Sequence, residues 1–192
     1  MNYFNLPSIS KEIIKRAAIS NIVCVPIEPQ IGSLPLSCLK NVKSYVEING
    51  GNIQFGWIFS CLGNVVLKKT AHAVVARDDK SLLCVTPNEY KLDNLNFSPD
   101  NSIEGLIKNT FLPTHFVALV QNRSLENFLS LERELDQLRL NNIGIVSSVD
   151  VREIERRAAV LYPEILDLAK KHTGGYDYCY CGSGRKRKNC CR

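Results

Sequence analysis

Four of the eight cysteines in this 192-residue chain lie within its last 14 residues. They are Cys179, Cys181, Cys190 and Cys191, whereas the other four are scattered singly along the chain. The N-terminus has no basic segment followed by an apolar one, so it does not resemble a secretory signal, and we expect a cytoplasmic protein. Cysteines in a reducing compartment serve metal binding or thiol chemistry more often than disulfides. The cysteine-rich tail is therefore expected to bind a metal ion.

The spacing of the four tail thiols suits a tetrahedral zinc site. Zinc prefers thiolate ligands at about 2.3 Å, and a structural site takes all four ligands from the protein. Cys179 and Cys181 would project to the same side of an extended segment, and Gly182 and Gly184 would let the chain turn tightly around the ion. Because so short and polar a segment cannot fold by burial alone, metal binding would supply its folding energy. The alternative is a disordered basic tail with incidental cysteines.

The tail also resembles a known zinc module. Its pattern over residues 178–192, Cys-x-Cys-Gly-Ser-Gly followed by Cys-Cys, is similar to the SEC-C motif, which ends the preprotein translocase ATPase SecA and many small bacterial proteins. The resemblance implies one structural Zn²⁺ with the ligands Cys179, Cys181, Cys190 and Cys191. It also implies contacts with a protein partner or the ribosome. The ATPase itself is not implied, because the chain contains no phosphate-binding Gly-x-x-x-x-Gly-Lys-Ser/Thr sequence.

The positive charge is concentrated in the same tail. The formal net charge is +5. From Tyr176 onward five bases and one acid give +4, while the preceding 175 residues carry 19 bases and 18 acids. Two interpretations of the run Arg185–Lys188 stay open. It contacts an anionic surface, either an acidic protein or, weakly, nucleic-acid phosphates, or it offsets the −2 charge that four thiolates and one Zn²⁺ carry together.

The remainder of the chain alternates between helical and strand-like patterns. Helical periodicity or capping signals predict helices at residues 10–19, 36–48, 103–109, 125–141 and 150–172, the last bent or broken at Pro163. Short β-branched or aromatic runs predict strands at residues 53–60, 65–69, 71–76, 81–86 and 115–121. The proline-rich segment 21–35 and the polar segment 88–102 are expected to be irregular.

This order of elements predicts an α+β fold with a small antiparallel sheet and flanking helices. We expect residues 1–122 to form an α+β body, residues 123–172 a helical segment packed on it, and residues 173–192 the zinc module. The most apolar run, residues 55–67, is interrupted by glycine and polar residues and is shorter than the ~20 residues of a membrane span. We therefore expect no membrane span.

A second group of reactive residues lies in the body. Cys38 is at the start of an expected helix, where the helix N-terminus stabilises a thiolate, and His72 follows in an apolar strand. In papain-like and transglutaminase-like enzymes a cysteine at a helix start likewise precedes a histidine on an antiparallel strand. In that chemistry the imidazole takes the thiol proton and later protonates the leaving group. A papain- or transglutaminase-like core is thus one alternative for the body.

The surrounding sequence resembles the N-terminal region of uncharacterised bacterial proteins that carry a SEC-C tail. The resemblance covers roughly residues 34–90. The matching segments are Cys38-x-x-Asn41, Gly56-Trp57, His72-Ala73-Val74 and Val85-Thr86-Pro87. Those proteins have an aspartate before the last segment, which would orient the histidine, but here Cys84 occupies that position. Three roles therefore stay open for Cys38 and His72: a catalytic pair, a degenerate site that keeps a pocket without turnover, or purely structural residues.

Two function hypotheses follow from the sequence. The first is a non-enzymatic zinc-binding protein whose basic module docks a protein partner or the ribosome. The second is a thiol hydrolase or acyl transferase that uses Cys38 and His72, with the zinc module directing it to its target.

Overall fold

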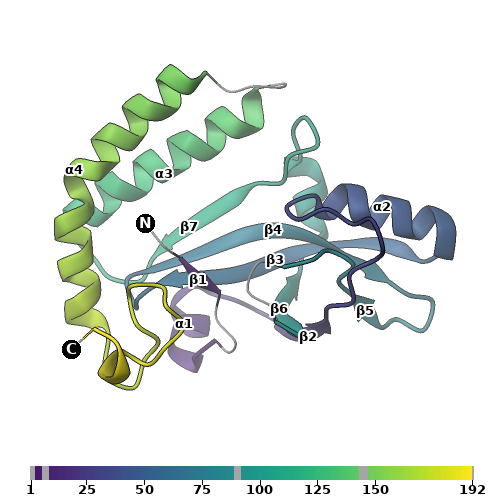
Figure 1. Ribbon diagram of the computed structural model, residues 1–192, viewed down its shortest axis with the longest axis horizontal. Helices are drawn as coiled ribbons and strands as arrows, with labels where there is room; N and C mark the ends of the chain where they lie inside the picture. The colour runs from purple at the N-terminus through teal and green to yellow at the C-terminus, as the bar shows by residue number, and fades with distance from the viewer. Residues whose placement is uncertain (1–2, 6–8, 89–91, 143–146, 192) are drawn as a thin grey trace.

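The computed structural model describes residues 3–5, 9–88, 92–142 and 147–191. Its strands are β1 (Phe4–Asn5), β2 (Val23–Pro26), β3 (Asn52–Leu62), β4 (Val66–Ala76), β5 (Leu82–Leu83), β6 (Asn94–Pro99) and β7 (Thr114–Ala118). Its α-helices are α1 (Lys11–Arg16), α2 (Cys38–Asn49), α3 (Arg123–Asn141) and α4 (Ser148–His172), and two 3₁₀ turns are η1 (Asn101–Leu106) and η2 (Arg187–Asn189). Figure 1 shows the sheet across the middle, with α2 over one end and α3 and α4 over the other. The predicted α+β class is confirmed.

A long hairpin of β3 and β4 forms the centre of the sheet. Its antiparallel register runs without a bulge from the pair Asn52 and Ala76 to the pair Leu62 and Val66. Gly63, at a φ of +50°, lies in the tight turn between the strands. The prediction of two separate strands, 65–69 and 71–76, is wrong, because Thr70 pairs with residues of β3 and β7 and so continues β4.

Five strands close into a ring. The pairing order is β2-β6-β3-β4-β5, and backbone hydrogen bonds then join the end of β5 back to β2. The Cys84 N–H donates to the Pro26 carbonyl, and the Glu28 N–H donates to the Cys84 carbonyl, both at 2.9 Å. The ring encloses a cluster of fully buried side chains, Val25, Val74, Cys84 and Phe97. We call this unit the five-strand ring.

Two strands of the ring were not predicted. β2 lies within the segment 21–35, and β6 lies within the polar segment 88–102, so both expectations of irregular chain are wrong in part. Each strand pairs with the other, from Val23 with Phe97 to Pro26 with Asn94. Their local sequences are rich in proline or asparagine, and partners distant in sequence supply the pairing that local propensity does not indicate. The short helix expected at 103–109 is the 3₁₀ turn η1.

The helices cover the sheet from two faces. Ile13 of α1 and Val42 of α2 belong to one buried cluster, together with alternate residues of β3 and β4. α3 and α4 pack against each other, and their apolar faces bury Val66 and Phe116. α4 continues through Pro163 without interruption, and Figure 1 shows that it changes direction along its length, as expected where a proline removes one backbone donor. Among the described residues, no helix is long and apolar enough to cross a membrane.

Candidate metal centre

The C-terminal module, which the structure describes over residues 173–191, folds back on itself through backbone hydrogen bonds. Tyr178 and Lys186 form an antiparallel bridge, and the Cys179 N–H donates to the Arg185 carbonyl at 2.8 Å. Between these arms Gly182 and Gly184 have φ values of +78° and +73°, a conformation that glycine adopts without strain. This turn places the first cysteine pair opposite the second pair.

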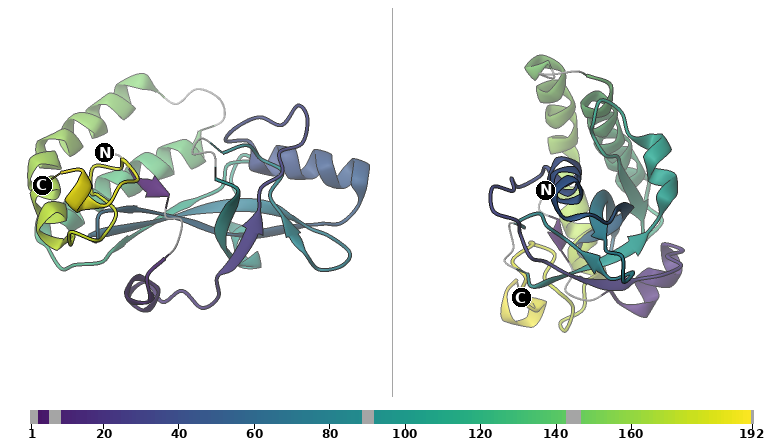
Figure 2. Two further views of the ribbon diagram at one scale, coloured as in Figure 1. Left: turned by 60° about the horizontal axis from the view of Figure 1, so that its bottom comes forward. Right: turned by 90° about the vertical axis from the view of Figure 1, so that its right-hand side faces the viewer.

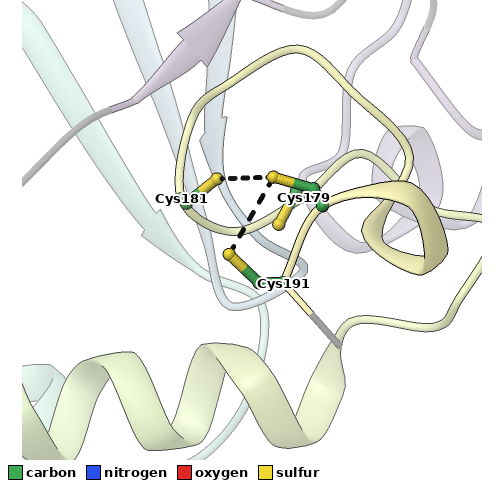
Figure 3. A group of neighbouring side chains, drawn as sticks. Cys179, Cys181 and Cys191 are labelled. Carbon is green, nitrogen blue, oxygen red and sulfur yellow. Dashed lines mark hydrogen bonds between the residues drawn. The ribbon is translucent and has the colours of Figure 1, made fainter.

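The four thiols of the module converge on one point. The Sγ atoms of Cys179, Cys181, Cys190 and Cys191 all lie within 4.8 Å of one another. The Cys181–Cys190 sulfur distance is 3.5 Å and the Cys190–Cys191 distance is 3.9 Å. Figure 3 shows the labelled side chains turned toward the centre of the loop. A tetrahedron with zinc–sulfur bonds of ~2.3 Å has sulfur–sulfur edges of about 3.8 Å, so this donor set fits a Zn²⁺ ion.

Polar neighbours shift the acidity of the thiols. Burial raises the pKa of Cys181, but hydrogen bonds from Ser183, Cys179 and Cys190 outweigh it and lower the pKa to about 6. Hydrogen bonds to Cys179 and Cys181 raise the pKa of Cys191 to about 12. A bound Zn²⁺ needs four thiolates, so its binding releases protons.

The module packs against the body through polar and aromatic contacts. Asn64, in the β3–β4 turn, donates to the Asp177 carboxylate at 2.7 Å and to the His172 carbonyl at 3.1 Å. The Tyr178 ring lies 5.1 Å from the Phe4 ring of β1, measured between centroids. Figure 2 shows the module beside the end of the β3–β4 hairpin and the end of α4. The sequence did not indicate these contacts, because their residues are far apart along the chain.

The basic residues of the module pair with its tyrosines. The Lys186 ammonium lies 3.9 Å from the Tyr178 ring centroid, and the Lys188 ammonium lies 4.0 Å from that of Tyr176. Arg187 also lies over a tyrosine, with its guanidinium carbon 5.9 Å from the Tyr180 ring centroid, and it donates a hydrogen bond to the Thr173 carbonyl that helps to close the module. The tyrosines occupy every second position from 176 to 180, and the bases lie together on the facing arm at 185–188, a pattern that could have indicated these contacts.

Cys38 and His72 lie on different elements, α2 and β4. Cys38 is the first residue of α2 and is buried, and desolvation raises its pKa although a backbone hydrogen bond from Ala73 acts in the opposite direction. Consecutive strand residues project to opposite faces, so the His72 side chain points away from the cluster that holds Cys38 and Ala73. The structure gives no hydrogen bond between the described residues Cys38 and His72. Their joint catalytic role stays a prediction.

His72 instead contacts the cysteine that replaces the expected aspartate. Its Nε2 lies 3.3 Å from the Cys84 Sγ, and burial lowers the pKa of His72 to about 4. Burial likewise raises the pKa of Cys84 to about 11. Both groups are therefore neutral at pH 7. The Cys84 thiol contacts the His72 imidazole and also donates to the Thr86 carbonyl, at an Sγ–O distance of 3.6 Å.

Comparisons with known proteins do not assign a family. No family model matches the chain, and no curated protein or solved structure matches it either. The similarity of residues 178–192 to SEC-C is thus a resemblance of a short motif. What the structure adds is the convergence of its four cysteines.

Proposed function

We propose that this chain is a zinc-binding protein whose C-terminal module holds one structural Zn²⁺. The convergence of four sulfur atoms within 4.8 Å of one another carries the proposal. Four protein thiolates fill a tetrahedral site and leave no position for water, so the ion is structural rather than catalytic. The ligands are Cys179, Cys181, Cys190 and Cys191.

The zinc assignment is tested by elemental analysis of the purified full chain. We expect one zinc per wild-type chain and a loss of this zinc in the double variant Cys190→Ser/Cys191→Ser. Cys24→Ser is the matched control, because Cys24 is exposed and lies outside the module, and it keeps the metal. A double variant that retains one zinc per chain would show that the ligands are elsewhere.

We further propose that the assembled module docks an acidic protein surface. Its residues from Tyr176 onward carry +4 with neutral thiols, and a Zn²⁺ bound by four thiolates reduces this to a net +2. Arg185, Lys186 and Lys188 are exposed. Because Lys186 and Lys188 already cover tyrosine rings, those faces are less open to stacking by nucleic-acid bases, and a protein carboxylate is the better partner.

Docking is tested with a poly-glutamate peptide and a single-stranded RNA of equal charge as the two probes. We expect the zinc-loaded chain to bind the peptide more tightly, and Arg185→Gln/Lys188→Gln to weaken this binding at least fivefold. Lys40→Gln/Lys43→Gln, two exposed lysines of α2, is the control that leaves binding unchanged. Tighter binding of the RNA would instead make nucleic acid the partner.

A further inference from the structure

The five-strand ring contains a thiol and an imidazole that the zinc module does not use. His72 projects from β4, and Cys84 follows β5, so two neighbouring strands place the side chains 3.3 Å apart, from Nε2 to Sγ. Hydrogen bonds from the Cys84 backbone to β2 fix its position on the opposite side. The pair therefore sits in a rigid part of the fold, where two backbones hold its geometry.

A small cavity lies directly beside this pair. It has a volume of about 70 Å³, several times the space that one water molecule needs. Its wall is mostly neutral: it includes apolar side chains such as Ile58 and Leu95, and polar groups such as Asn5, Thr86 and Asn96. Apart from His72 and Cys84 themselves, no described lining residue is ionisable. The cavity thus suits a small, uncharged ligand.

We propose that Cys84 is a nucleophilic thiol, with His72 as its general base, and that it takes small, uncharged acyl compounds from this cavity. A thiol and an imidazole within hydrogen-bond distance are the two groups that covalent acyl transfer needs. From the sequence, Cys38 was the candidate nucleophile. We assign that role to Cys84 instead, because Cys84 is the thiol that His72 contacts. The cavity supplies the place for the acyl group.

The reaction balances with water as the final acceptor. As the Cys84 Sγ bonds to the carbonyl carbon, His72 Nε2 takes the thiol proton and the carbonyl electron pair moves to oxygen. When the carbonyl re-forms, the leaving group departs with that proton and Cys84 carries a thioester. Water then attacks the thioester, giving a carboxylic acid and restoring the thiol.

The first test measures alkylation of each cysteine in the zinc-loaded protein, resolved by peptide mapping. We expect Cys84 to react with uncharged iodoacetamide at least tenfold faster than with anionic iodoacetate, after both rates are normalised to a free thiol. We also expect His72→Gln to slow the reaction of Cys84 about 10²-fold, the typical contribution of a general base. Exposed Cys24 is the internal control, and its rate does not depend on His72.

The pH dependence separates base catalysis from simple thiolate reactivity. A free thiol reacts about tenfold faster per pH unit up to about pH 8.5, because its thiolate fraction rises. Cys84 has its base already in contact, so we expect a rate that is nearly flat between the pKa values of the pair, about 4 and about 11. Among the described residues, Cys38 is a further titratable group that acts on Cys84, and a thiolate there raises the pKa of Cys84.

The second test uses para-nitrophenyl acetate as a small, uncharged acyl donor. We expect a hydroxylamine-sensitive acetyl group on Cys84 that is absent in Cys84→Ser. Failure to label Cys84 until the protein is unfolded, or an unchanged rate in His72→Gln, would overturn the proposal. Labelling of Cys38 instead, with dependence on His72, would also overturn it and restore the assignment made from the sequence. Zinc content is measured in parallel, so a failure here is distinct from a failure of the zinc assignment.

Discussion

The five-strand ring and the C-terminal module reach a fixed structure by different physical means. The ring buries Val25, Val74 and Phe97 completely, so removal of apolar surface from water stabilises it. In the module, the described residues that are fully buried are Thr173 and Cys179, and Tyr176 is 77% exposed. Hydrophobic burial can hold the ring together, whereas the proposed Zn²⁺ would stabilise the module. The ring and the module should therefore respond to different perturbations, the ring to changes in packing and the module to loss of metal.

The largest expected effect follows removal of zinc by a strong chelator. Structural zinc contributes roughly 10–16 kcal/mol in small modules, and the described part of this module has little apolar packing to replace it beyond Tyr178 and Tyr180 against the body. We expect trypsin to cleave rapidly at Arg185–Lys188 after chelation, while the ring stays resistant. The readout is limited proteolysis followed by mass spectrometry. Equal resistance with and without zinc would remove the contrast between the two regions.

A substitution that disturbs packing in the ring should destabilise the ring and leave the zinc module intact. A Cβ on Gly56 would lie 2.3 Å from the Phe97 ring and 2.4 Å from the Ser98 carbonyl oxygen, which cannot both move away. We expect Gly56→Ala to lower the free energy of unfolding by about 3 kcal/mol, at the upper end of typical overpacking costs, with zinc content unchanged. Urea denaturation measures this change. The control is Gly105→Ala, because no atom lies within 4 Å of its added Cβ.

Acid should weaken the ring through His72. Burial lowers the folded-state pKa of His72 to about 4, whereas an unfolded histidine titrates near 6.5. The unfolded state therefore binds more protons between these values, and stability is full above pH 6.5 and falls as the pH drops toward 4. We expect a loss of about 2–3 kcal/mol over this window.

The control for this pH effect is His72→Gln, which removes the titrating group and should flatten that part of the profile. The measurement is the free energy of unfolding of zinc-loaded protein, obtained from urea denaturation at several pH values and monitored by a spectroscopic signal from the ring. A wild-type profile that is no steeper than that of the variant would contradict the account.

The smallest expected effect concerns the contact between the two regions. Asn64→Ala removes hydrogen bonds to Asp177 and to the His172 carbonyl, and net hydrogen bonds contribute about 1 kcal/mol each. Together the two bonds amount to about 2 kcal/mol, so we expect zinc affinity to fall about thirtyfold, because the module then folds with less support from the body. Competition with a chromophoric chelator measures the affinity. Asn49→Ala, an exposed amide on α2 that bonds only Tyr45 of its own helix in the described contacts, should leave it unchanged.

The parts of the molecule that were predictable are those whose signal is local. The apolar stripe of α3 and the N-cap at Ser10 both depend on residues that are close in sequence. In the structure the Ser10 side chain accepts a hydrogen bond from the Ile13 N–H, as an N-cap does. The four tail cysteines are local as well, because the turn at Gly182 and Gly184 is enough to bring them together.

The parts that were missed depend on partners distant in sequence. β2 and β6 are strands because they pair with each other, although about seventy residues separate them. The contact of His72 with Cys84 arises in the same way, since it needs both the alternation of β4 and the closure of the ring. The sequence placed Cys84 where a carboxylate would orient His72, but it could not show which thiol His72 reaches.

X-ray absorption spectroscopy at the zinc edge tests the central claim most directly. It reads the identity and distance of the ligands around the metal in the purified full-length protein. We expect four sulfur ligands at about 2.3 Å and no nitrogen or oxygen bound to the zinc. Nitrogen or oxygen bound to the zinc, or a protein that holds no zinc, would contradict this claim.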